Sequence, residues 1–155
     1  MNLFDKFLAV FKVFEENEVE YILIGGFAVI LYGFPRLTQD IDLLIRMSDS
    51  NIEKLQRALF QIFNDKEVYQ ITLDDLQEYA VVRYGSADGF HLDLISRIGE
   101  MAKYEDVKYK IITVSDIPIR TATPESLKDL KKDSLRPEDQ RDLVFLEELI
   151  KSKNK

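Results

Sequence analysis

Two short motifs in the first third of the chain combine residue types that are used in phosphate and metal chemistry. Gly25 and Gly26 directly follow the apolar run 21–24. A glycine pair after a strand lets backbone N–H groups approach a phosphate closely. Asp40 and Asp42 then open a second apolar run. Two carboxylates at i and i+2 of a strand point to one face, where they can hold a divalent cation. The pairing indicates nucleotide chemistry.

A third carboxylate, Asp93, lies inside the apolar run 90–95 and shares a strand face with His91, the only histidine. An isolated Asp in a strand is equally compatible with an edge position that faces water. If the strands adjoin, Asp40, Asp42 and Asp93 form a cluster that suits Mg²⁺ and substrate phosphates. Such ions activate an attacking oxygen and stabilise a leaving group. His91 is either a proton relay or a half-buried histidine with satisfied hydrogen bonds.

The elements that must position these residues alternate along the chain. Apolar periodicity predicts helices over 3–17, 26–32 and 48–63, and a capping box predicts a short helix over 73–79. Alternation and turn signals predict strands over 21–24, 40–46, 68–71, 80–84, 90–96, 108–114 and 117–121. Two further helices are expected to begin at Pro124 and Pro137.

This order predicts an α/β (α+β) fold with a mixed β-sheet flanked by helices and a C-terminal helical tail. A chain of 155 residues is long enough to bury most of its apolar surface as one domain. We therefore expect a single domain over 1–155, with a core over about 20–121 and a helical tail over 123–151.

Composition excludes several classes of protein. The net charge of −7 does not favour long-range attraction of nucleic acid, so a small nucleotide is the better partner. No apolar run approaches the roughly 18 residues of a membrane span, and the N-terminal segment lacks the features of a signal peptide. The absence of Cys excludes disulfides, zinc thiolate sites and Cys nucleophiles. We expect a cytoplasmic location.

These motifs resemble the nucleotidyltransferase superfamily typified by DNA polymerase beta. The closer resemblance is to small stand-alone members related to AbiEii toxins. It is carried by Gly25-Gly26, by the segment 36–43 with its Arg-Leu-Thr and Asp-Ile-Asp-Leu elements, by Asp93, and by the tail segments 124–131 and 136–143. It spans roughly residues 20 to 148.

The resemblance implies metal-dependent transfer of a nucleoside monophosphate from an NTP to a hydroxyl acceptor. Asp40 and Asp42 would bind the metal ions, Mg²⁺ or Mn²⁺, and Asp93 would complete the site and help to activate the acceptor. The acceptor is an RNA 3′ end, a protein Tyr or Ser, or a small metabolite. A homodimer and an antitoxin partner are both compatible with the resemblance.

The same resemblance implies a nucleotide-binding set. Backbone N–H groups of Gly25 and Gly26 would hold the triphosphate, next to the Arg-x-Thr element with Arg36 and Thr38. Arg36 or Lys131 would neutralise phosphate charge, although either residue is equally compatible with a surface ion pair.

The sequence allows two roles for a pair of carboxylates in the tail and one competing function for the whole chain. Asp139 and Asp142 share a helix face and either orient Lys131 or Arg136 or simply form salt bridges. The competing function is a non-catalytic module that binds nucleotide or a partner. It predicts that Asp93 does not face the acidic pair, or that the pocket is too closed for a triphosphate.

Overall fold

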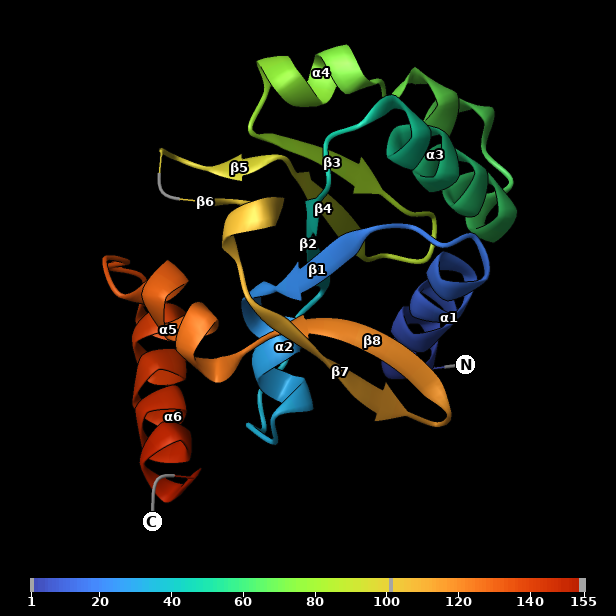
Figure 1. Cartoon of the computed structure of the whole chain (residues 1–155). Helices are drawn as coiled ribbons and strands as arrows, with labels where there is room; N and C mark the ends of the chain where they lie inside the picture. Colours follow the sequence, from blue (N-terminus) through green and yellow to red (C-terminus); the bar gives the residue numbers. More distant parts are fainter. Residues whose placement is uncertain (1, 101, 154–155) are drawn as a thin grey trace.

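The computed structural model describes residues 2–100 and 102–153, and a six-stranded mixed sheet forms its centre (Figure 1). The strands of this sheet are β1 (Tyr21–Ile24), β2 (Asp40–Ile45), β3 (Val81–Gly85), β4 (His91–Ile95), β7 (Tyr109–Val114) and β8 (Ile117–Ala122). The helices are α1 (Leu3–Glu16), α2 (Gly25–Leu31), α3 (Asp49–Phe63), α4 (Leu73–Glu78), α5 (Pro124–Lys131) and α6 (Pro137–Lys153). A small two-stranded ribbon consists of β5 (Arg97–Ile98) and β6 (Ala102–Lys103).

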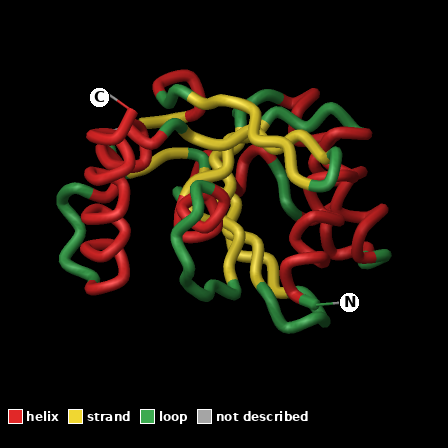
Figure 2. Tube along the Cα trace, turned by 90° about the horizontal axis from the view of Figure 1, so that it is seen from below, coloured by secondary structure: helices red, strands yellow, loops and turns green. Residues whose placement is uncertain are grey.

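The strand order of the sheet is β3-β4-β2-β1-β8-β7. Strand β2 pairs antiparallel with β1 and parallel with β4, and β1 pairs parallel with β8. The edges are supplied by the antiparallel hairpins β3–β4 and β7–β8. In Figure 2 the strands run between two groups of helices, with α5 and α6 on one side and α1 and α3 on the other. The predicted fold class, a mixed sheet flanked by helices with a C-terminal helical tail, is confirmed.

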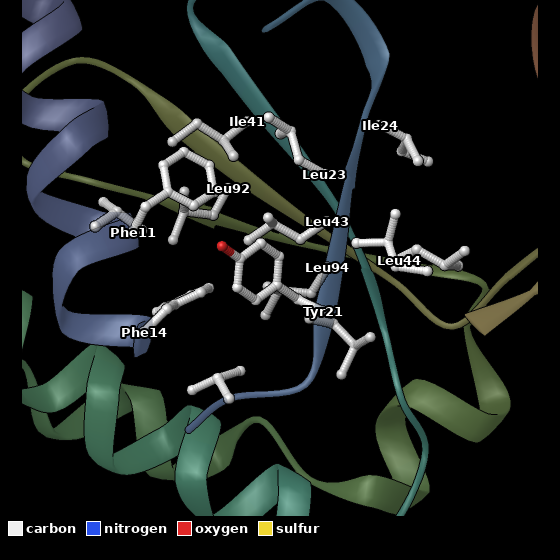
Figure 3. Packing of buried hydrophobic residues seen from close by; sticks show 14 of the residues in the cluster. Phe11, Phe14, Tyr21, Leu23, Ile24, Ile41, Leu43, Leu44, Leu92 and Leu94 are labelled. Carbon is white, nitrogen blue, oxygen red and sulfur yellow. The ribbon is translucent and has the colours of Figure 1, made fainter. Parts of the chain in front are cut away.

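The main hydrophobic core lies between the sheet and the N-terminal helices. Figure 3 shows Phe11 and Phe14 of α1 directed towards Tyr21, Leu43 and Leu94 of the central strands. All five side chains are almost completely buried. Full burial of an aromatic or leucine side chain contributes about 1.5–3 kcal/mol relative to its exposure. This core therefore fixes the positions of β1, β2 and β4, which carry the candidate site.

Strand alternation assigns the carboxylates to the other face of the sheet. Ile41 and Leu43 of β2 are fully buried and belong to the core face, whereas Asp40 and Asp42, between and beside them, are only partly buried. Successive side chains of a strand point to opposite faces. The acidic residues thus lie on the sheet face away from α1 and α3, outside the main hydrophobic core.

Most helix boundaries follow from residues that satisfy free backbone N–H groups at the helix start. Ser48 caps α3, Thr72 forms the capping box of α4, and Thr123 caps α5 directly before Pro124. Such caps typically contribute about 1 kcal/mol each. They confirm the predicted starts of these three helices.

The sequence-based prediction was wrong at one segment and incomplete at another. Residues 68–71 do not form a strand, because Asp65 caps a 3₁₀ helix over Lys66–Gln70 in which Val68 is buried. The ribbon β5–β6 was not predicted, since two-residue strands are too short to show alternation. Among the described residues, no helix is long and apolar enough to cross a membrane.

Candidate active site

The candidate site begins at the junction of β1 and α2, where Gly25 follows the buried Ile24. Gly25 has a φ of +75°, and a Cβ atom at this position would lie 2.0 Å from Oδ2 of Asp42. Both the backbone conformation and the close approach of the carboxylate require glycine. At Gly26, an added Cβ would lie 2.9 Å from Nη1 of Arg36. The glycine pair thus brings the start of α2 against one acidic and one basic side chain.

We expect the substitution Gly25→Ala to lower the free energy of unfolding by about 2 kcal/mol or more, because positive φ and a steric clash with Asp42 add together. Chemical denaturation measures this loss. Gly89→Ala is the matched control, since Gly89 has a φ of +88° and an added Cβ would meet no atom within 4 Å. Equal losses for the two variants would show that the approach of Asp42 has no energetic consequence.

Strand register brings the three predicted carboxylates together. Asp42 pairs with Ile24 of β1 on one side and with Asp93 of β4 on the other, so its side chain shares a sheet face with Asp93. Asp40 pairs with His91, two residues before Asp42 and Asp93 on the same two strands, so it shares their sheet face. The prediction that Asp40, Asp42 and Asp93 converge beside the turn at Gly25 therefore agrees with the positions of all three residues.

One arginine and one histidine side chain contact this acidic group. Arg83 of the edge strand β3 donates from Nε to Oδ1 of Asp93 at 2.8 Å and from Nη2 to Oδ2 of Asp93 at 3.0 Å. Its Nη2 also lies 3.6 Å from Oδ2 of Asp40. His91 Nδ1 lies 3.2 Å from Oδ1 of Asp40. Asp93 and Asp40 are thus paired with protein groups, whereas Asp42 faces the glycine turn.

The pKa values of the two neighbouring acids are displaced in opposite directions. Burial, followed by the charges of Asp93 and Asp40, raises the pKa of Asp42 from 3.8 to about 7. Burial also acts to raise the pKa of Asp93, but the hydrogen bonds and charge of Arg83 outweigh it and hold that pKa below its usual value. Close carboxylates of this kind bear an electrostatic cost that a bound cation would relieve.

The donor chemistry of this group fits a divalent cation. Asp40, Asp42 and Asp93 supply hard carboxylate oxygens, which Mg²⁺ and Mn²⁺ prefer, and burial, followed by the charges of Asp93 and Asp40, raises the pKa of Asp42. Yet within the described part of the chain, no three or more His, Cys, Asp or Glu side chains form a ready set of metal ligands. Both oxygens of Asp93 accept hydrogen bonds from Arg83 instead.

A cavity of about 460 Å³ adjoins Gly25 and Asp42. This volume lies within the range of about 300–1,000 Å³ that is usual for small-molecule sites. One part of its lining is apolar, and the other part carries charge. The apolar residues are Ile24, Ala80, Val81, Ile95, Ile98, Leu127 and Leu130. The charged residues are Asp42, Arg97, Lys131, Arg136 and Asp139.

A buried ion-pair network connects the helical tail to this cavity. Lys131 of α5, which is 7% exposed, lies 2.9 Å from Oδ1 of Asp139 and 3.1 Å from Oδ2 of Asp142. Asp142 is fully buried and also pairs with Arg36. Its other oxygen, Oδ1, has no hydrogen-bond partner among the described residues. Asp139 further binds Arg136. The two tail carboxylates therefore hold all three basic side chains in place.

Thr38 lies elsewhere. Its hydroxyl donates a hydrogen bond to the backbone carbonyl of Asp40 and accepts one from the backbone N–H of Asp40, each at 3.3 Å. Thr38 lines a second, shallower pocket with Leu37, Gln39, Arg83 and His91. The structure thus places Gly25 and Lys131 at the first cavity and Arg36 against Gly26. Thr38 lies on the side of the acids that carries Arg83 and His91.

Arg83, which donates two hydrogen bonds to Asp93, was not predicted from the sequence. The only available signal was the hairpin over 80–96, in which the turn sets the pairing of the two strands. The observed register pairs Arg83 with Asp93 and Gly85 with His91. A shift of one residue would have moved Arg83 to the other sheet face, and a five-residue turn signal does not resolve one residue.

The fold and the acidic strand pair define the chain as a protein of nucleotidyltransferase fold. Over 92% of this chain and 95% of the other, it superimposes on the lincosamide antibiotic adenylyltransferase LnuA in its lincomycin-bound form, with 15% identity and a TM-score of 0.59. An antigenic nucleotidyltransferase-like protein from Paracoccidioides brasiliensis is 16% identical, with a TM-score of 0.62 over 93% of this chain and 75% of the other. At such identities the likeness establishes the fold alone.

The family itself follows from the sequence. Residues 6–141 match the family described as nucleotidyl transferase AbiEii toxin, Type IV TA system. The chain belongs to this AbiEii nucleotidyltransferase family, and its membership supports a nucleotidyl transfer activity. A comparison with curated proteins gives no match.

Proposed function

We propose that the protein transfers a nucleoside monophosphate from an NTP to a hydroxyl acceptor, with a divalent cation held by Asp40, Asp42 and Asp93. The observation that carries this proposal is the pairing of Asp42 with Asp93 on adjacent strands, directly against Gly25 at the start of α2. The cation, Mg²⁺ or Mn²⁺, would polarise the transferred phosphoryl group and stabilise the charge of the leaving pyrophosphate.

The nucleotide is proposed to occupy the cavity beside Gly25. The apolar part of the lining suits a base and sugar, while the backbone N–H groups of Gly25 and Gly26 face the phosphates. Lys131 and Arg136, which line the cavity, offset the phosphate charge, and Arg36 acts beside Gly26. Since Lys131 belongs to the tail, we further propose that core and tail work as one domain.

The hydroxyl acceptor is proposed to enter from the opposite side of the acids. Phosphoryl transfer places the attacking and leaving oxygens roughly in line. If pyrophosphate leaves on the Lys131 side, the acceptor approaches through the shallow pocket of Thr38, Asp40, Arg83 and His91. Asp93, which pairs with Asp42 of the first cavity and binds Arg83 of the second pocket, then accepts the proton of the hydroxyl. The acceptor is proposed to be an RNA end, a protein side chain or a metabolite.

Transfer of label tests the proposal. The protein is incubated with each α-³²P-labelled NTP, Mg²⁺, and separate pools of RNA, protein and small metabolites. We expect label in one pool with the wild type and a loss of at least about 10²-fold with Asp93→Asn, which keeps the shape of the side chain but removes a base and a negative ligand. Omission of Mg²⁺ should have the same effect.

The competing function, a non-catalytic module, makes the opposite prediction. It would be supported by NTP binding without label in any pool, or by label that Asp93→Asn transfers at the wild-type rate. This module was expected to have Asp93 facing away from the acidic pair or a pocket too closed for a triphosphate. Neither expectation matches the geometry, because Asp93 shares a sheet face with Asp42 and the cavity has a volume of about 460 Å³. Transfer is therefore the function that the site supports better.

The description of the family suggests a biological setting. We propose that the chain acts in the cytoplasm as the toxin of a toxin–antitoxin pair and that an antitoxin, or a second copy of the chain, is its partner. Induced expression should then arrest bacterial growth. The Asp93→Asn variant, produced at the same level, should leave growth unaffected.

A further inference from the structure

Arg83 lies where a cation bound to the acidic residues would have to contact its ligands. Its guanidinium group forks onto both oxygens of Asp93, at 2.8 and 3.0 Å, and reaches Oδ2 of Asp40 at 3.6 Å. The planar fork of an arginine matches a carboxylate in this bidentate geometry. The side chain therefore bridges two of the three carboxylates that the proposed function assigns to the cation.

The neighbouring basic groups are engaged with other partners. Lys131 contacts Asp139 and Asp142, and His91 contacts Asp40. Arg83 is thus the basic side chain whose hydrogen bonds satisfy Asp93. It also lies on β3, an edge strand of the sheet, and about half of its side chain is exposed. It can swing towards solvent without disturbing the buried core.

A guanidinium and a divalent cation cannot both hold Asp93 at full strength. Both oxygens of this carboxylate already accept hydrogen bonds from Arg83, and two positive charges a few ångströms apart repel each other. Binding of the cation therefore weakens the contact between Arg83 and the carboxylates. By reciprocal linkage, the contact with Arg83 weakens binding of the cation by the same factor.

We propose that Arg83 is a positioning residue that competes with the divalent cation for Asp93 and Asp40, so that binding of the cation releases its guanidinium group. The inference rests on the proposed three-carboxylate site. Released, Arg83 remains in the shallow pocket with Thr38 and His91, on the side by which the acceptor is proposed to enter. Arg83 therefore raises the cation concentration at which the site becomes occupied. It also links binding of the cation to the pocket through which the acceptor is proposed to enter.

Titration with Mn²⁺, followed by electron paramagnetic resonance of the free ion, tests this competition. We expect Arg83→Gln to bind Mn²⁺ about tenfold more tightly than the wild type, because a competing charge is removed. Arg46→Gln is the matched control: it makes the same change of charge, but Arg46 lies beyond the far end of β2 and pairs with Glu20. Its Mn²⁺ affinity should equal that of the wild type.

A second measurement separates competition from damage to the fold. Without added metal, Arg83→Gln should melt at a lower temperature than the wild type, since Asp93 loses its partner. Saturating Mn²⁺ should raise the melting temperature of Arg83→Gln by more than that of the wild type. Arg83→Lys, which keeps the charge but not the fork, should bind Mn²⁺ with an affinity between those of the wild type and Arg83→Gln.

The outcomes distinguish this inference from the proposed function. If the wild type binds Mn²⁺ and Arg83→Gln binds it equally or more weakly, the competition is refuted and the three-carboxylate site stands. If neither protein binds Mn²⁺ in the millimolar range, the cation site and the inference both fail. Tighter binding by Arg83→Gln, with Arg46→Gln unchanged, supports the inference.

Discussion

Replacing Asp42 by Asn is expected to lower the rate of nucleotide transfer by at least about 10³-fold and, at the same time, to stabilise the protein at pH 8 by up to about 4 kcal/mol. The loss of activity follows from the removal of a negative ligand at the centre of the proposed site. The gain in stability follows from burial and from the charges of Asp93 and Asp40, which raise the pKa of Asp42 from 3.8 to about 7.

The pH window of the stability gain follows from that shift. Between pH 4 and 7 the folded protein binds one more proton at Asp42 than the unfolded chain does, so its stability falls as the pH rises. Above pH 7 the full cost of the buried charge is present. The difference between Asp42→Asn and the wild type should therefore be small at pH 4, grow through pH 7 and then stay constant.

Urea denaturation at several pH values, without added Mg²⁺, measures this difference, and label transfer measures the rate. Asp88→Asn is the control, because Asp88 lies in the exposed turn between β3 and β4 with 55% of its side chain accessible. It should alter neither quantity. A variant Asp42→Asn that transfers nucleotide at the wild-type rate would remove Asp42 from the mechanism.

Replacing Asp142 by Ala is expected to destabilise the protein by about 3 kcal/mol. The carboxylate is fully buried and pairs with both Lys131 and Arg36, so its removal leaves two basic side chains without their shared partner. Breaking a buried ion pair from one side typically costs 3–5 kcal/mol. We place the value at the lower end, about 3 kcal/mol, since Lys131 retains Asp139.

The same substitution should weaken nucleotide binding. Lys131 and Arg36 would no longer be held beside Gly25 and Gly26, so the Kd of a fluorescent ATP analogue should rise about tenfold. Asp129→Ala, an exposed carboxylate on α5, controls for the loss of a charge from the tail and should change neither stability nor affinity by a measurable amount. A stable Asp142→Ala variant would mean that the ion pairs contribute little net energy.

Local patterns were sufficient to predict the framework. The apolar runs at 21–24 and 40–46 each read as a buried strand, and they became β1 and β2. Alternation then required Asp40 and Asp42 to share one sheet face, which is the face away from α1. Caps such as Ser48 and Thr123 lie within a few residues of the helices that they start, so they too were visible in the sequence.

Contacts between distant segments could not be predicted in the same way. The pairing of Arg83 with Asp93 depends on the register of a hairpin, which a single residue in the turn can change. The contact between Arg36 and Asp142 joins positions 106 residues apart. From the sequence, Arg36 was a candidate for phosphate binding or a surface ion pair, and Asp142 was expected to orient Lys131 or Arg136 or to form salt bridges. Only tertiary packing decides that Asp142 is completely buried.

The ion pairs of α6 also have a consequence for the order in which the molecule is made. Lys131 and Arg36 obtain their buried partners from Asp139 and Asp142, which lie near the C-terminal end of the sequence. On the ribosome, the glycine turn and the acidic strands emerge long before these partners do. A nascent chain therefore carries the carboxylates of the proposed site early but pairs Lys131 and Arg36 with their buried partners last, so the proposed activity would begin only after α6 has docked.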